Sequence, residues 1–186
     1  GRCCAYVTLL YTDDYLPGVV ALAENLRAIS SPHPLLVLVP KQEIPVLSVS
    51  TLNALMLVDV QTIPVPVEQY YTSARNGTAL GELGLGVWLK LHLWSLGEDI
   101  DSIVFLDADV VLLDNIDELF EVEGFGAVGG GRYFGGSVLV LQPSGEEHSH
   151  MLESLRKSKG GYIYGEQDFL NLHFAVERTV LPNEYR

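Results

Sequence analysis

The first third of the chain alternates short apolar runs with apolar residues at helical spacing. Ala5–Leu10 and Leu35–Val39 are apolar runs of strand length, and Pro40 ends the second. Between them, Asp13-Asp14 and Pro17 suit the first turn of a helix. The apolar residues that follow recur on one helical face: Leu16, Val19, Val20, Ala23 and Leu26. The pattern predicts a strand, a helix and a second strand.

The pattern continues with a helix over Ser50–Leu57 and a strand over Val58–Val65. Strands that alternate with helices form a parallel sheet with helices on both faces. We therefore expect an α/β, Rossmann-like domain.

The second half adds a helix over Val87–Leu96 and strands over Ser102–Leu106 and Ser137–Leu141. Two further helices are predicted over Glu146–Lys157 and Glu166–Phe174. The segment from Glu68 to Gly86 is rich in Gly, Thr and Tyr and predicts a long loop, which is typically functional or mobile. Tyr70 and Tyr71 in it could contact an acceptor or lie on the surface. No repeat or domain boundary is visible, so residues 1–186 are expected to form one domain.

Charge narrows the possible partners of this domain. The chain has 186 residues and a formal net charge of −13. Such a surface repels nucleic acid and anionic membranes, so neither is an expected partner. It also repels an anionic nucleotide ligand, unless a bound divalent cation neutralises the charge locally.

Two adjacent cysteines, Cys3 and Cys4, offer no disulfide framework and are expected to open the first buried strand. No signal peptide and no apolar run of membrane-spanning length is visible. These features favour a reducing, cytoplasmic location.

The most informative segment is the fourth apolar strand and the acids that follow it. Ile103-Val-Phe-Leu106 leads into Asp107-Ala108-Asp109. In extended chain, alternate residues point to the same face, so both carboxylates can reach one point. Two carboxylates so close repel unless a proton or cation lies between them, and hard oxygen ligands suit Mg²⁺ or Mn²⁺. An EF-hand is excluded because Val111 and Leu112 stand where it needs an oxygen ligand and a glycine.

Four blocks of the chain resemble the glycogenin-like members of retaining glycosyltransferase family 8. They are Ala5–Gly18, Lys90–Leu96, Phe105–Phe120 and Phe134–Ser144, the last followed by Gly165–Asn171 and Leu181-Pro182. The resemblance implies a GT-A type domain, a UDP-sugar donor, Mn²⁺ (or Mg²⁺), and a homodimer. The donor sugar would be glucose or galactose, and the acceptor a hydroxyl on a glycan or a protein.

The resemblance also implies a role for individual residues. Asp107 and Asp109 would bind the metal and the diphosphate, with Ala108 near the ribose, and Lys90 would contact the nucleotide-sugar. Leu9, Tyr11, Thr12 and Tyr15 would line the uridine pocket. The segment Gly135, Gly136 and Ser137 would bind the nucleotide-sugar and face the transferred sugar. The catalytic candidates on the same side would be Glu166, Gln167 and Asp168.

Packing offers an alternative explanation for several of these residues. Tyr15 could staple the first helix to the sheet, and Lys90 could be a solvated helix residue. His92 and Trp94 are expected in the core rather than in chemistry.

Three departures from the family pattern stand out. Gly135 replaces an Asn, and Glu166 stands where a Gly-Asp-Gln motif has Asp. A later His-containing segment that supplies a third metal ligand in the family has no counterpart here, so the domain is expected to lack a C-terminal segment.

The expected activity is retaining transfer of a hexose to a separate acceptor on a cytoplasmic protein. A self-glucosylating primer is one alternative. A nucleotidyltransferase or a non-catalytic nucleotide-sugar-binding protein are alternatives from other classes.

Overall fold

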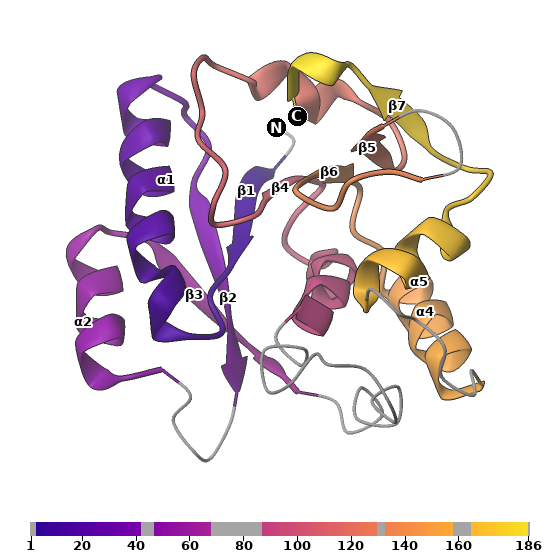
Figure 1. The fold of residues 1–186 in the computed structure, drawn as a ribbon, viewed down its shortest axis with the longest axis horizontal. Coiled ribbons are helices and arrows are strands. Elements are labelled where there is room, and N and C mark those ends of the chain that lie inside the picture. Colours follow the sequence, from indigo (N-terminus) through magenta and orange to yellow (C-terminus); the bar gives the residue numbers. More distant parts are fainter. Residues whose placement is uncertain (1–2, 42–46, 68–86, 130–132, 158–164, 186) are drawn as a thin grey trace.

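The fold is organised around a seven-stranded sheet, seen in a computed structural model that describes residues 3–41, 47–67, 87–129, 133–157 and 165–185. The strand order is β3-β2-β1-β4-β6-β5-β7 (Figure 1). The strands span Cys4–Leu9 (β1), Leu35–Lys41 (β2), Gln61–Pro66 (β3), Ser102–Leu106 (β4), Gly126–Val128 (β5), Val138–Leu141 (β6) and Thr179–Leu181 (β7). β1, β2, β3 and β4 run parallel, whereas β6 is antiparallel to both β4 and β5. The prediction of an α/β domain with a mainly parallel sheet is confirmed.

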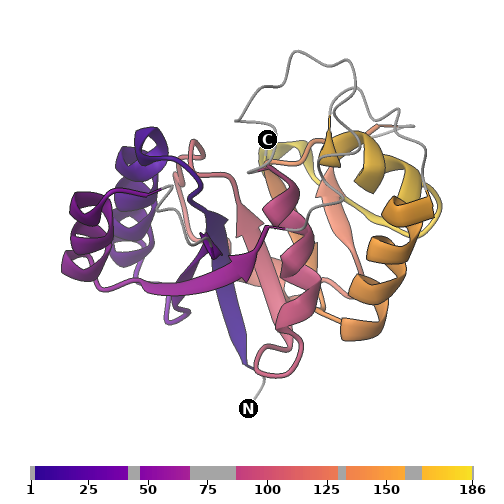
Figure 2. The same cartoon turned by 90° about the horizontal axis from the view of Figure 1, so that it is seen from below.

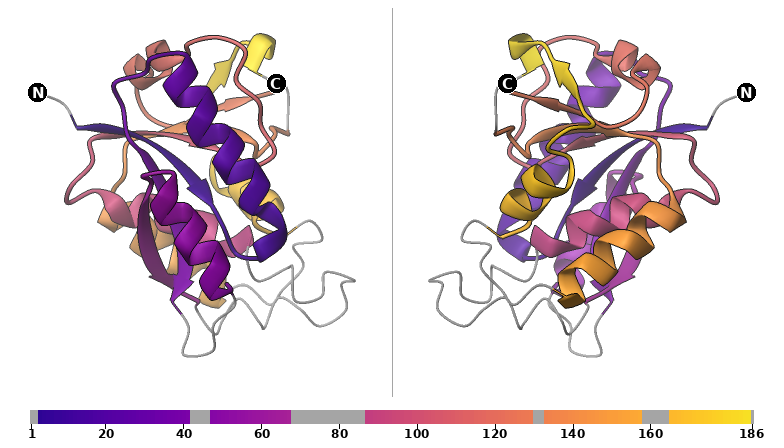
Figure 3. Two further views of the ribbon diagram at one scale, coloured as in Figure 1. Left: turned by 90° about the vertical axis from the view of Figure 1, so that its left-hand side faces the viewer. Right: turned by 90° about the vertical axis from the view of Figure 1, so that its right-hand side faces the viewer.

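Helices cover both faces of this sheet (Figures 2 and 3). One face carries α1 (Leu16–Ala28) and α2 (Val49–Leu57), and the other carries α4 (Gly145–Lys157) and α5 (Glu166–His173). The 3₁₀ helix η3 (Val87–Leu96) packs on the same face as α4 and α5. Shorter 3₁₀ turns are η1 (Asp13–Tyr15), η4 (Asp117–Glu121) and η5 (Asn183–Tyr185).

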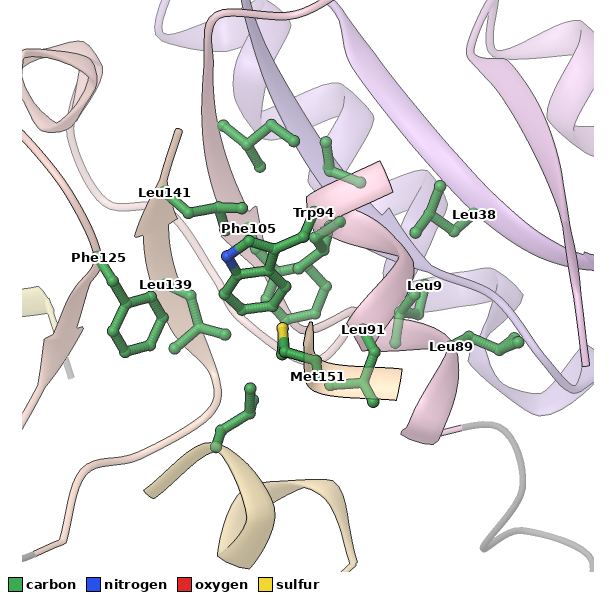
Figure 4. Packing of buried hydrophobic residues seen from close by; sticks show 14 of the residues in the cluster. Leu9, Leu38, Leu89, Leu91, Trp94, Phe105, Phe125, Leu139, Leu141 and Met151 are labelled. Atoms are coloured by element: carbon green, nitrogen blue, oxygen red, sulfur yellow. The ribbon is translucent and has the colours of Figure 1, made fainter. Parts of the chain in front are cut away.

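The alternation of side chains along the central strands divides the core into two clusters. Val7 and Leu9 of β1 face η3, α4 and α5, while Tyr6 and Leu10 face α1 and η4. Figure 4 shows the first cluster, to which Trp94 of η3 and Phe105 of β4 both belong. Residues 88–94 are all buried, whereas Ser95 near the end of η3 is exposed. His92 and Trp94 are core residues, as the sequence predicts.

Several boundaries differ from the sequence prediction. The predicted strand Val58–Val65 starts only at Gln61, because Val58 ends α2 and Asp59 adopts a φ of 54° that turns the chain. Strands β5 and β7 were not predicted, and each has three residues. Both cysteines are free, and Cys3 is exposed rather than buried. The predicted loop 68–86 and residues 130–132 lie outside the described residues.

Candidate active site

A cavity of about 130 Å³ opens at the carboxyl ends of β1 and β4. These two strands are parallel neighbours, so the residues that follow them emerge at the same edge of the sheet. Strand β6 runs the opposite way and starts at this edge, with Val138 paired to Leu106. The cavity is lined by Leu9, Tyr11, Tyr15, Lys90, Asp107, Ala108, Asp109 and Glu166. All eight belong to the set that the sequence and the resemblance proposed.

The two aspartates leave the sheet on a tight turn rather than on extended chain. The Asp107 N–H donates to the Ser137 carbonyl at 2.9 Å, and the Val110 N–H donates to the Asp107 carbonyl at 3.0 Å. The second bond closes a four-residue turn, in which Asp107 and Asp109 are the first and third members. Both side chains still line the same cavity.

Lys90 is the buried cation of the site. Its ammonium lies 3.2 Å from Asp107 Oδ1 and 3.3 Å from Glu166 Oε1, and it donates to the Gly136 carbonyl at 3.1 Å. It also lies 4.8 Å from the centre of the Phe105 ring. Burial favours the neutral amine, but the two carboxylates outweigh it and raise the pKa of Lys90 above its ordinary value. The interpretation of Lys90 as a solvated helix residue is therefore excluded.

Glu166 is the first residue of α5 and the most buried carboxylate of the cavity, at 7% exposure. Gly165 precedes it with a φ of 70°, a conformation that favours glycine and turns the chain into the helix. Burial raises the pKa of Glu166, against the opposing effect of Lys90. The site thus holds one ammonium between two carboxylates, Asp107 and Glu166, in different environments.

Two tyrosines, Tyr11 and Tyr15, also line the cavity. The rings of Tyr11 and Tyr15 are 5.1 Å apart, tilted by 43°. Burial and then a hydrogen bond with Tyr15 raise the pKa of Tyr11, so its hydroxyl stays protonated. Tyr15 also packs against the core cluster beneath α1, so it both lines the cavity and fastens the helix. Thr12 precedes η1 and lies outside the lining, and its Oγ1 is buried without a hydrogen-bond partner among the described residues.

The segment from Phe134 to Ser137 brings Gly136 to Lys90 and is held in place by α5. The Phe134 N–H donates to Asn171 Oδ1 at 2.7 Å, and the Phe134 carbonyl accepts from Asn171 Nδ2 and Gln167 Nε2, both at 3.1 Å. Gly135 donates to the Val128 carbonyl at 2.9 Å. Asn171 is 6% exposed and is a supporting residue that sequence reasoning did not assign, although it ends the quoted Gly165–Asn171 block.

The remaining predicted site residues lie outside the lining of this cavity. The Gln167 side chain donates to the Phe134 carbonyl, and Asp168 accepts a hydrogen bond from the Tyr133 hydroxyl at 3.1 Å. Ser137 lines a second, larger hollow that also reaches Asp109. Gly135 and Gly136 contribute backbone groups from the edge of the site.

The donor set at the turn suits a hard divalent cation. Asp107 and Asp109 supply carboxylate oxygens to one cavity, and Mg²⁺ is commonly held by one or two carboxylates with substrate phosphates and water. Within the described ranges, no group of three or more His, Cys, Asp or Glu side chains is placed to hold a metal. Asp107 and Asp109 therefore fit a divalent-cation site in which oxygens of the substrate supply the remaining ligands.

Known proteins resemble this chain over most of its length. Residues 6–130 match the model of glycosyl transferase family 8. Glycogenin-1 of Mus musculus is 35% identical over 175 residues, which cover 92% of this chain and 50% of that protein. Galactinol synthase 1 of Solanum lycopersicum is 28% identical over 213 residues, which cover 98% of this chain and 64% of that protein. The chain thus spans about half the length of the first of these curated relatives.

Solved structures share the fold at low sequence identity. The galactosyltransferase LgtC, in complex with donor and acceptor sugar analogs, superposes with a TM-score of 0.72 at 17% identity, covering 95% of this chain and 72% of that one. The glycosyltransferase GlyE of Streptococcus pneumoniae gives a TM-score of 0.66 at 17% identity, covering 100% of this chain and 47% of that one. The expected GT-A type of the fold is confirmed. None of the described helices has the length and apolar character needed to cross a membrane.

Proposed function

The chain belongs to glycosyl transferase family 8, and we propose that it transfers a hexose from a UDP-sugar to a hydroxyl acceptor with retention of configuration. The observation that carries this proposal is a single cavity in which two tyrosines, a buried lysine and three carboxylates meet. Glucose or galactose would be the donor sugar, and the acceptor a glycan or protein other than the chain itself. The family match and the similarity to glycogenin-1 support the glycosyltransferase activity.

Different residues of the cavity would have different roles in such a reaction. Tyr11 and Tyr15 offer aromatic surface for the base. Asp107 and Asp109 would hold Mn²⁺ or Mg²⁺, which when bound supplies positive charge for the departing diphosphate. Lys90 pairs with Asp107 and adds a second fixed positive charge close to the same point. The oxocarbenium-like sugar would meet the protein near Glu166 and Gly136, which Lys90 ties together.

The test is release of UDP from UDP-glucose and UDP-galactose without acceptor, with Mn²⁺ or with EDTA. We expect wild-type protein to hydrolyse one donor slowly, and only with metal. Asp109→Ala should lower this rate on the order of 100-fold or more, because the lost charge stabilisation amounts to several kcal/mol. Asp99→Ala removes an exposed carboxylate beyond the other end of β4 and serves as the matched control.

Each other outcome assigns a different function. Full activity of Asp109→Ala with Mn²⁺ would contradict the site. UDP binding without any release from either donor would identify a nucleotide-sugar-binding protein instead. Exchange of pyrophosphate into a nucleoside triphosphate would identify a nucleotidyltransferase. Labelled sugar that becomes attached to the chain would favour the self-glucosylating alternative.

A further inference from the structure

Gly18, the third residue of α1, lies directly against the backbone of the turn that carries the two aspartates. A Cβ built on Gly18 would lie 2.0 Å from the Ala108 carbonyl oxygen and 2.9 Å from its carbonyl carbon. Cβ contacts below 3.0 Å are essentially never found, so any side chain here would push helix and turn apart by about 1 Å. The atoms in the way are backbone atoms, which cannot rotate aside as a side chain would.

Helix α1 is fixed to the core more firmly than the turn is. Val19, Leu22, Ala23 and Leu26 are all buried against the sheet at 0–6% exposure. The turn projects beyond the end of β4, and Asp109 is exposed. A clash at Gly18 is therefore relieved most easily by displacing the turn rather than the helix.

The helix contacts the same segment a second time, two turns further along. The Leu112 N–H donates to Asn25 Oδ1 at 3.3 Å. Gly18 and Asn25 are seven residues apart and so lie on one face of α1. This face of α1 therefore contacts the segment of residues 108–112 at two points.

We propose that Gly18 is a positioning residue, which sets the Asp107-Ala108-Asp109 turn at the place where its carboxylates can hold a divalent cation with UDP. The proposal rests on the proposed function for the identity of the ligand. Metal–oxygen distances in such sites hold within about 0.2 Å. A shift of about 1 Å is therefore enough to separate the carboxylates from a shared ion, and misplacements of this size cost about 100-fold in catalysis.

The test measures Mn²⁺ binding in the presence of UDP by the loss of the free-ion EPR signal, together with the thermal unfolding midpoint. Gly18→Ala should raise the half-saturating Mn²⁺ concentration at least about 10-fold. Gly145→Ala is the matched control, since Gly145 opens α4 and a Cβ there meets nothing within 4 Å. We expect it to bind Mn²⁺ like wild type.

Asn25→Ala gives an independent measurement, because it removes the second contact without introducing a clash. It should raise the half-saturating concentration about 2- to 5-fold at a nearly unchanged midpoint. A folded Gly18→Ala protein with wild-type Mn²⁺ binding would overturn the proposal. So would an unfolded Gly18→Ala protein if Asn25→Ala binds Mn²⁺ normally. Wild-type protein that does not bind Mn²⁺ with UDP would instead contradict the proposed function.

Discussion

Lys90 places a full positive charge inside the protein, within 3.3 Å of two carboxylates. Lys90→Met would leave Glu166 buried without its cation, and removal of one partner from a buried pair typically costs about 3–5 kcal/mol. Asp107 is 31% exposed and regains some hydration, so we expect the free energy of unfolding to fall by about 3 kcal/mol. Urea denaturation at neutral pH measures this loss.

A control and a pH series separate this effect from loss of side-chain volume. Lys157→Met removes an exposed pair with Glu153 and should change stability by less than about 0.5 kcal/mol. Burial raises the pKa of Glu166, so its carboxyl in Lys90→Met takes up a proton more readily than in the unfolded chain. The deficit should therefore shrink as the pH falls towards about 5. A deficit that does not change with pH would show that uncompensated charge is not its cause.

Asn171 satisfies both backbone groups of Phe134 at the entrance to β6. Asn171→Leu would leave the Phe134 N–H buried without this acceptor, at a cost of about 1–3 kcal/mol per group. We expect a loss of about 2 kcal/mol, since Gln167 still donates to the Phe134 carbonyl. Chemical denaturation against Leu172→Ala, whose side chain is 68% exposed, tests this expectation. A wild-type midpoint for Asn171→Leu would show that water replaces the side chain.

Where α4 packs on η3, two histidines meet. The rings of His92 and His148 are 5.2 Å apart, and His92 Nε2 lies 2.9 Å from the Pro66 carbonyl oxygen. His148 Nε2 is buried and has no hydrogen-bond partner within the described segments. Burial, and then the neighbouring His92, lowers the pKa of His148 from 6.5 to about 4. The packing of α4 on η3 therefore requires a neutral imidazole.

This packing should make the protein less stable in acid. The unfolded chain binds a proton at His148 below about pH 6.5, whereas the folded chain resists until about pH 4, so stability is lost as the pH falls through this window. Between about pH 7.5 and about pH 5, the free energy of unfolding of wild-type protein should fall further than that of His148→Leu. Allowing for partial solvent access, we expect the two losses to differ by about 1 kcal/mol. Urea midpoints at the two pH values measure the difference. His150→Gln, on the exposed side of α4, should keep the wild-type pH dependence, and a wild-type slope in His148→Leu would contradict the prediction.

The elements that could be predicted from the sequence are those in which enough residues are buried to show a hydrophobic pattern along the chain. β1, β2 and β4 each contain five consecutive buried residues, nearly all of them apolar, and α1 shows four buried residues on one face. β5 and β7 have three residues each, too few to show a period, and they depend on pairing with each other and with β6. Val58 is apolar but ends α2, because Asp59 reverses the chain.

The lining of the candidate site was largely within reach of the sequence, because the ends of β1 and β4 meet at one edge. The sequence did not show which of several neighbouring side chains point into the cavity. Successive helical residues point about 100° apart, so Glu166 faces the cavity while Gln167 and Asp168 point elsewhere. The tight turn at Asp107 depends on a bond to Ser137, thirty residues away in the chain, which no local pattern reports.

For the molecule as a whole, the net charge of −13 and the local charge of the cavity have the same sign. The charged side chains lining the cavity are the carboxylates of Asp107, Asp109 and Glu166 and the ammonium of Lys90. Without a metal ion, a diphosphate approaching this site meets net negative charge both nearby and at long range. Binding of an anionic nucleotide should therefore depend on salt in the opposite sense to binding by a basic protein.

We expect UDP to bind more tightly as salt increases, when no metal is present. Between about 10 mM and about 100 mM salt the screening length falls from about 30 Å to about 10 Å, which weakens the repulsion from distant carboxylates. The dissociation constant of UDP in EDTA, measured by calorimetry, should fall about 2- to 5-fold over this range. Uridine carries no charge and is the matched control, with a constant that should not change. If UDP binding weakened with salt instead, Lys90 rather than the acidic surface would dominate the field that the diphosphate meets.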